Sequence, residues 1–424
     1  MTNFMTTGQS LVIEEELRFY QFLGPLTKEF SLLVSRLQNN QDNDAKWLVV
    51  GITRSLRGLV FALNTKPSFS VLFKWLWDSD RIQALTECAK RYNDEPLVIH
   101  SIFKFFIELT QNRSQRLAFS VSSENGYMLF RTVAYLVSSY GRKLIENGKV
   151  IGPSTPQKGQ VIQKAQSSEA YESILKGMQL LFKLLHSTLS SNVLNFGVFK
   201  SFRDDTLNEV FEVLLLIVET KISDFSGLLN YPKCADVFYL LLEQLAEDHI
   251  EWFSSLPEQK LIKFLLALKC GLTSSISGVQ TRSCTTLDHL TTHVYRELKR
   301  RKILENDFPR EMQVELGLPE AKLCSLSILL NTNKAILEEM LALSVYHILF
   351  EECKNQWSIS RPLLPLILFN PTYFEKLKSD VIEQTAMTAP SEEYVVRMRN
   401  DIESCFKKLM VDIEESLDIR NRDK

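Results

Sequence analysis

The sequence predicts an all-α protein, arranged as an α-solenoid. Apolar residues recur at steps of three and four through most of the 424 residues, which is the period of amphipathic helices. The chain has only 15 glycines and 13 prolines, too few turn residues to join the many strands of a sheet fold. Hydrophobic residues make up 45% and charged residues 24%, so the chain has enough apolar side chains for a large core.

The expected helices follow from this periodicity. Leu48, Ile52, Leu56, Leu59 and Leu63 illustrate it, since they place one apolar stripe along a single helix. We expect helices near residues 11–37, 45–63, 69–91, 96–111, 124–146, 168–189, 205–221, 232–247, 257–273, 279–303, 308–330, 333–352, 359–369, 371–384 and 391–418.

The spacing of these helices indicates a repeat architecture. Two helices occupy roughly 40 residues, which is the period of HEAT or armadillo repeats rather than that of a tetratricopeptide array. A helix pair of this kind cannot bury its apolar face alone, so successive pairs stack into one continuous core with a long concave inner surface. We therefore expect HEAT-like repeats.

One segment interrupts the repeats. Residues 148–168 contain two prolines, three glycines and many polar side chains, so they can bury little apolar surface. We expect a flexible loop there, between HEAT-like repeats over residues 1–147 and further repeats over residues 169–424.

Charge and cysteine usage exclude several classes of protein. The net charge is −2 and the pI about 6.4, so no overall basic field favours nucleic acid as a partner. No apolar stretch approaches the roughly 20 residues that span a bilayer, and no membrane insertion is expected. The odd number of cysteines, seven, without any C-x-x-C, is typical of thiols in a reducing compartment.

No catalytic or cofactor-binding motif is visible. The sequence has no G-x-G-x-x-G, no G-x-x-x-x-G-K-[ST] and no G-x-S-x-G, so we expect neither an enzyme nor a bound cofactor. His289 and His293 have the i, i+4 spacing of zinc helices, with Cys284 and Asp288 nearby. Leu290 stands where a metalloprotease needs a glutamate, so no metal site is expected, and a zinc-dependent hydrolase remains the enzyme alternative.

Several polar motifs are more specific than helix packing requires. They are RGLVFA at 57–62, NRSQR at 112–116, NFGVF at 195–199, LDH at 287–289, CKNQWSISRPLL at 353–364 and NRD at 421–423. Together, and in this order, they resemble the C-terminal part of exportin-7 proteins and their Ran-binding sister proteins. Asn and Ser in such turns can cap helix ends, and Arg113 and Arg116 can bind exposed carbonyls or carboxylates of the next repeat.

The resemblance implies a karyopherin-β HEAT solenoid of the importin-β superfamily. Its implied partners are the GTP form of the Ran GTPase, folded protein cargo and nucleoporins, for a monomer that shuttles between nucleus and cytoplasm through the nuclear pore. The family's N-terminal importin-β-type domain has no counterpart here, so we expect weak Ran binding by this chain. The alternatives are a HEAT-repeat scaffold without transport activity and an exportin-4-like carrier.

Charged segments are the candidate partner-binding residues. The acidic candidates, for basic patches on a partner, are Asp204, Asp205, Glu243, Glu247, Asp248 and Glu251, with solvated helix faces as the alternative. The basic run Lys299, Arg300, Arg301 and Lys302 is expected to end a helix, where cations complement the helix dipole. Its alternatives are a basic patch for an acidic partner or a signal like those for nuclear localisation.

Overall fold

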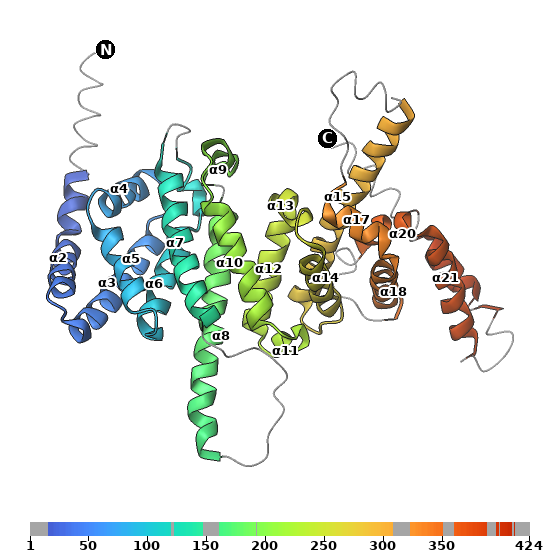
Figure 1. Ribbon diagram of the computed structural model, residues 1–424, viewed down its shortest axis with the longest axis horizontal. Coiled ribbons are helices and arrows are strands. Elements are labelled where there is room, and N and C mark those ends of the chain that lie inside the picture. Colours follow the sequence, from blue (N-terminus) through green and yellow to red (C-terminus); the bar gives the residue numbers. More distant parts are fainter. Residues whose placement is uncertain are drawn as a thin grey trace. The chain divides into compact units, whose positions relative to one another are not determined.

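The structure is a computed structural model that describes residues 16–119, 123–146, 161–191, 193–307, 323–350, 360–387, 396–397, 399–408 and 411. Over these residues every regular element is a helix and none is a β-strand, as Figure 1 shows, which confirms the all-α prediction. The chain divides into two compact units, Met1–Leu241 and Leu242–Lys424, which are described separately below.

The helices of the first unit follow one another with short connections. They are α2 (Gly24–Gln38), α3 (Asp42–Ala62), α4 (Lys66–Trp77), α5 (Arg81–Arg91), α6 (Pro96–Leu109), η1 (Arg113–Gln115), α7 (Asn125–Glu146), α8 (Val161–Leu189), α9 (Gly197–Phe202), α10 (Thr206–Lys221), α11 (Phe225–Leu229) and the first part of α12 (Pro232–Asp248).

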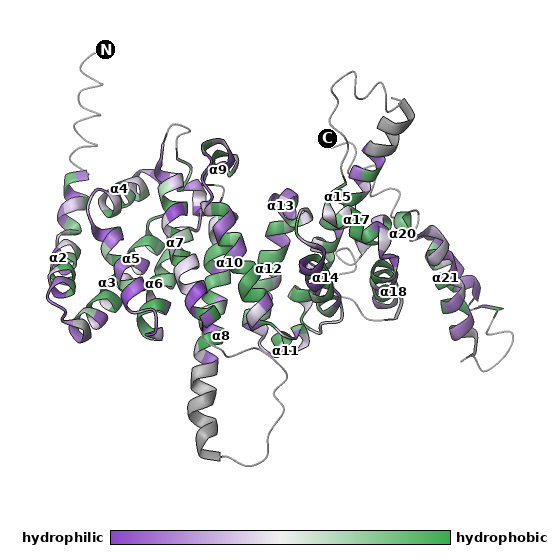
Figure 2. Cartoon of the chain, in the orientation of Figure 1, coloured by the Kyte–Doolittle hydropathy of each residue, from purple (hydrophilic) through white to green (hydrophobic). Residues whose placement is uncertain are grey.

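These helices form two layers, as expected for HEAT-like repeats. In one layer α2 packs against α5, α5 against α7, and α7 against α10. In the other, α3 packs against α6 and α6 against α8, while α2 with α3, α5 with α6 and α7 with α8 pair across the layers. Each pair therefore covers the apolar faces of its neighbours, which is how a solenoid builds its core. Figure 2 shows hydrophobic and hydrophilic residues interspersed along these helices.

The middle of this stack is closely packed. Phe103, Phe105 and Phe106 of α6 are fully buried because α6 has neighbours in both layers. Gly141 lets α7 approach α10, since a Cβ at this position would lie 2.4 Å from Cγ1 of Val213. No larger residue fits at Gly141 without moving one of the two helices.

Two buried hydroxyl pairs join successive helices of the second layer. Thr53 and Ser101 connect α3 to α6, with their oxygens 2.6 Å apart. Thr110 and Ser187 connect α6 to α8 in the same manner, at 2.7 Å. Each pair therefore links two helices by a polar contact in an otherwise apolar interface, in addition to the hydrogen bonds that Thr53, Thr110 and Ser187 make to carbonyls of their own helices.

The second unit continues the pattern of paired helices. After the end of α12 it contains α13 (Ile250–Ser254), α14 (Glu258–Leu272), α15 (Ser277–Asp307), α17 (Ser325–Thr332), α18 (Lys334–Phe350), α20 (Leu363–Phe369) and α21 (Pro371–Met387). α14 packs against α15 and α18, α15 against α17 and α20, and α18 against α20 and α21. None of the described helices is both long and apolar enough to cross a membrane.

The helices differ from expectation in several places, and the short helices α9, α11 and α13 were not expected. The helix expected over 69–91 is two helices, because Asp78, Ser79 and Asp80 favour a turn between α4 and α5. α8 begins at Val161, so the last eight residues of the segment expected as a loop, 161–168, are helical. The prolines and glycines of that segment all precede Val161, and residues 161–176 contain neither. Residues 147–160 lie outside the described part.

Candidate partner-binding surfaces and the motifs between repeats

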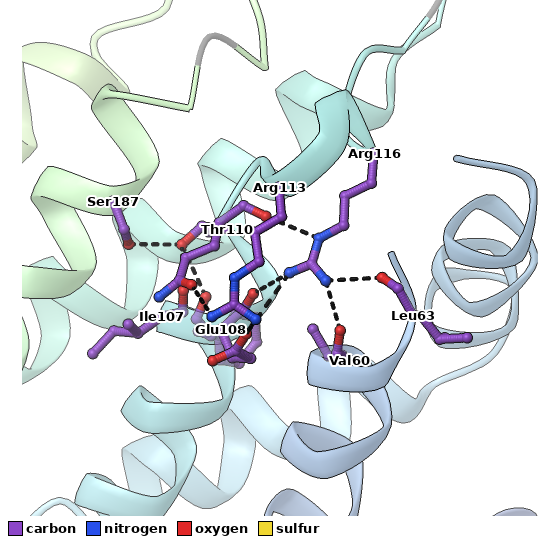
Figure 3. Close-up of polar contacts among 10 residues, drawn as sticks. Val60, Leu63, Ile107, Glu108, Thr110, Arg113, Arg116 and Ser187 are labelled. Carbon is purple, nitrogen blue, oxygen red and sulfur yellow. Dashed lines mark hydrogen bonds and ion pairs between the residues drawn. The ribbon is translucent and has the colours of Figure 1, made fainter. Parts of the chain in front are cut away.

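The polar turn that follows α6 is built around a buried guanidinium. Arg116 is fully buried, and it donates four hydrogen bonds to backbone carbonyls (Figure 3). Nη1 binds the carbonyls of Val60 at 2.6 Å and Leu63 at 2.9 Å, Nη2 binds Glu108 at 2.7 Å, and Nε binds Gln111 at 2.9 Å. The last carbonyls of a helix have no partner in the helix itself, and this one side chain serves the ends of both α3 and α6.

Arg113 supports the same turn from a more exposed position. Its Nη1 lies 2.9 Å from Oε1 of Glu108, and its Nη2 donates to Oε1 of Gln111 at 2.6 Å. The guanidinium also lies over the ring of Phe61, 4.8 Å from its centre. The two arginines were expected to bind carbonyls or carboxylates of the next repeat. Arg116 does bind carbonyls, but those of Val60 and Leu63 belong to the preceding helix α3, and Arg113 binds side chains beside its own turn, so the expected direction was wrong.

Asn112 ties the turn to α8. Its Nδ2 donates to the carbonyl of Ser191 at 2.8 Å, and its Oδ1 accepts from the backbone N–H of Leu117 at 2.8 Å. Ser114 and Gln115 have positive φ angles of 50° and 56°, so the backbone turns sharply enough to aim Arg116 inward. The NRSQR motif thus joins three repeats, and its Asn112, Arg113 and Arg116 side chains are bound to other groups of this chain.

Asp204 is likewise engaged within the fold. Its carboxylate accepts hydrogen bonds from the backbone N–H of Thr206 at 2.9 Å, from the hydroxyl of Thr206, and from the hydroxyl of Tyr127. Burial raises the pKa of Asp204, but these hydrogen bonds and nearby Arg131 outweigh it, so the net pKa is lowered. Its neighbour Asp205, in contrast, is exposed at the start of α10 and is available to a partner.

The remaining acidic candidates gather around the end of α12 and α13. Glu243 is half-buried and lies 3.9 Å from Nε of Arg282; burial raises its pKa and Arg282 opposes this. Glu247, Asp248 and Glu251 are exposed. Carboxylates in the last turn of a helix oppose its dipole, so Glu247 and Asp248 do not stabilise α12. Their position at the end of α12 favours an interaction of these carboxylates with basic groups outside the helix.

The basic run lies inside a helix rather than at its end. α15 continues to Asp307, which corrects the expectation that Lys299 to Lys302 form a helix C-terminus. The residues that follow contain no proline or glycine before Pro309, so the helix is not interrupted. Lys299 and Arg300 are exposed, while the side chains of Arg301 and Lys302 lie outside the described part.

A group of lysines on α6, α8 and α12 was not found from the sequence. Burial lowers the pKa of Lys176, and the nearby charges of Lys104, Lys233 and Lys183 lower it further, so these three lysines lie around Lys176. Lys176 donates to Oε1 of Gln179 at 2.9 Å, and none of the four forms an ion pair within the described residues. We call these four residues the lysine cluster. These lysines are separated by up to 129 residues, so no local sequence motif predicts that they lie together.

The histidine pair is not brought together as a ligand pair. Among the described residues, the group that could hold a metal ion is His293 with Glu297 and Cys324, not with His289. This group differs from the one considered from the sequence, which combined His289 and His293 with Cys284 and Asp288.

The full chain is similar to known proteins. It is 33% identical over 433 aligned residues to Ran-binding protein 17 of Homo sapiens and 34% identical over 433 to exportin-7-B of Xenopus laevis. Ran-binding protein 16 of Drosophila melanogaster is 31% identical over 414. These alignments cover 97 to 100% of this chain.

This chain is similar to exportin-7 proteins over its full length. The resemblance carried by the polar motifs is thereby confirmed. The chain spans about a third of the length of these curated relatives, because the alignments cover 35 to 36% of each of them. No protein-family model matches it, and no solved structure matches it either.

Proposed function

We propose that this chain is part of a nuclear transport receptor that binds protein cargo together with Ran in its GTP form and carries it through the nuclear pore. The observation that supports this most directly is the similarity along the whole chain to exportin-7 and to Ran-binding proteins 16 and 17. A solenoid suits this role, since its extended surface can contact two proteins at once. The proposal includes no catalytic step and no cofactor, and it places the protein in both nucleus and cytoplasm.

Exposed charges supply the proposed contacts. Asp205, Glu247, Asp248 and Glu251 offer carboxylates to basic patches on a partner, and Lys299 and Arg300 offer the opposite charge. The lysine cluster is a second cationic surface, and its mutual repulsion is relieved when acidic groups of a partner approach. Asp204 and Glu243 make contacts within the fold beside these exposed charges. Arg301 and Lys302 remain candidates because they adjoin Lys299 and Arg300 in the sequence.

Nucleoporin contact is proposed on separate grounds. Phe202, Trp47 and Phe22 are exposed by 76%, 69% and 66% of their surface. Exposed aromatic rings are ready to receive other apolar side chains with little rearrangement. They lie on α9, on α3 and before α2, respectively.

Binding to Ran tests the proposed function. The purified chain is titrated with Ran carrying either a non-hydrolysable GTP analogue or GDP, at low and at physiological salt, because screening of exposed charges falls as salt is lowered. We expect weak binding, with a dissociation constant above about 1 µM, that prefers the GTP form and weakens with salt. When cargo and Ran are added together, each is expected to bind the chain more tightly than alone, because coupling between two binding sites is reciprocal.

Matched variants locate the contact. The triple variant Glu247→Gln, Asp248→Asn and Glu251→Gln removes three exposed carboxylates, and it weakens binding if these residues face a partner. The control, Glu87→Gln with Glu212→Gln, removes exposed carboxylates elsewhere and leaves binding unchanged. Equal binding of both nucleotide forms would instead favour the scaffold without transport activity, and binding tighter than about 1 µM would contradict the weak contact expected of this chain.

A further inference from the structure

Three potential metal ligands from two helices meet in the second unit. His293 and Glu297 lie one turn apart on α15, and Cys324 is the residue that caps the N-terminus of α17. One donor atom of each side chain lies within 4.8 Å of the other two, and all three residues are half-buried.

The carboxylate already holds the cysteine in place. Oε1 of Glu297 accepts the backbone N–H of Cys324 at 2.9 Å, and Oε2 accepts its thiol at 3.0 Å. The hydroxyl of Ser327 donates to the same Oε2, while Sγ of Cys324 accepts the backbone N–H of Ser327 at 3.3 Å. The thiol and the carboxylate are thus oriented before any ligand arrives, as outer contacts orient the ligands of known metal sites.

Capping alone does not account for the histidine. Glu297, Cys324 and Ser327 close the start of α17 among themselves, and the imidazole of His293 takes no part in those hydrogen bonds. In the described part of the chain the ring makes no hydrogen bond at all, although it is half-buried beside a carboxylate and a thiol. Its nitrogen therefore remains available as a third donor.

The donor set matches one class of ion. Thiolate sulfur, imidazole nitrogen and carboxylate oxygen are the three ligand types that zinc takes in proteins. With metal–ligand distances of about 2.0–2.3 Å, tetrahedral ligand atoms stand about 3.3–3.8 Å apart. The present separations, 3.0 Å for the sulfur and Oε2 and up to 4.8 Å within the group, need shifts of only about 1 Å to reach this geometry.

We propose that His293, Glu297 and Cys324 form a binding site for a zinc-class divalent cation that joins α15 to α17. Binding forms one bond from the metal to each ligand and releases the thiol proton of Cys324 to solvent, so that thiolate and carboxylate together balance the two positive charges. A water molecule completes the coordination. The site is independent of the proposed transport function, and its expected effect is to hold the two helices together.

Cobalt(II) is the probe, because it replaces zinc in such sites and its bands report the ligands. The reduced full chain, stripped of metal with a chelator, is titrated with cobalt. We expect one equivalent to produce a sulfur-to-metal charge-transfer band in the near ultraviolet and strong ligand-field bands in the visible, all removed by one equivalent of zinc. Zinc also raises the melting temperature, since it binds the folded form.

Conservative variants identify the ligands. Cys324→Ser removes the thiolate but keeps a good helix cap, so the variant folds; His293→Gln keeps the size of the side chain. Both are expected to lose the charge-transfer band or weaken cobalt binding at least tenfold. The controls, Cys405→Ser at an exposed cysteine and His289→Gln one turn earlier on α15, keep the wild-type spectrum. A spectrum without sulfur coordination in the wild-type chain, or one that keeps both its charge-transfer band and its cobalt affinity in either Cys324→Ser or His293→Gln, would overturn the assignment.

Discussion

Replacing Arg116 with methionine tests whether one buried guanidinium holds successive repeats together. The substitution keeps an unbranched side chain but removes all four hydrogen bonds to backbone carbonyls. The carbonyl of Val60 lies in a buried contact, and leaving such an acceptor unpaired costs about 1–3 kcal/mol. The other three are partly buried and can recover water, at about 0.5 kcal/mol each. The expected loss of unfolding free energy is about 3 kcal/mol.

Thermal and chemical unfolding measure this loss. For a unit of this size, 3 kcal/mol corresponds to a fall in melting temperature of about 6–12 °C. Arg113→Met is the matched control: Arg113 is 36% exposed in its side chain and pairs with Glu108, so its loss costs less than about 1 kcal/mol. If both variants melt within 2 °C of each other, Arg116 does not anchor the repeats and the reasoning fails.

Three further predictions concern packing and pH. Gly141→Ala lowers the free energy of unfolding by about 1–3 kcal/mol because α7 and α10 must separate. Gly58→Ala lies on an open face of α3 and raises the free energy of unfolding by up to about 1 kcal/mol. Urea unfolding of both variants measures the two changes. Burial and neighbouring lysines lower the pKa of His100 to about 4, so stability is full above pH 6.5 and falls as pH drops toward 4, a loss that His100→Gln removes in acid titrations. Because the pKa of Asp204 is lowered, its carboxylate stabilises the folded state above about pH 4, and this stabilisation is lost in stronger acid. In acid, the difference in unfolding free energy between wild type and Asp204→Asn therefore disappears. Tyr127→Phe shows the same trend more weakly.

The sequence predicted the helices better than their ends. Amphipathic periodicity is a property of each helix alone, so α3 could be expected from five leucine and isoleucine positions. The break at Asp78 was missed because apolar residues keep the helical spacing on both sides of the turn. The run from Lys299 was interpreted as a helix end because basic residues are typical there, yet local charge does not stop a helix that lacks a proline or glycine.

Surface features were predictable only where they are local. Arg116 was singled out because it belongs to a compact polar motif, and the structure gives it a structural role. The lysine cluster could not be found, because Lys104 and Lys233 become neighbours only when α6, α8 and α12 are folded. The metal-binding group was also missed, because Cys324 is 27 residues from Glu297 in the sequence. The sequence pattern paired His293 with a second histidine, and that pattern points to neither Glu297 nor Cys324.

The two hydroxyl pairs of the first unit determine how this stack of helices can flex. Sliding α6 along α3 by half a turn, about 2.7 Å, would carry the oxygens of Thr53 and Ser101 beyond hydrogen-bond distance inside an apolar interface. Tilting the helices about an axis through the pair leaves that distance unchanged. Thr110 and Ser187 impose the same condition between α6 and α8. When this unit bends, we therefore expect its helices to tilt about these two contacts more readily than they slide past one another.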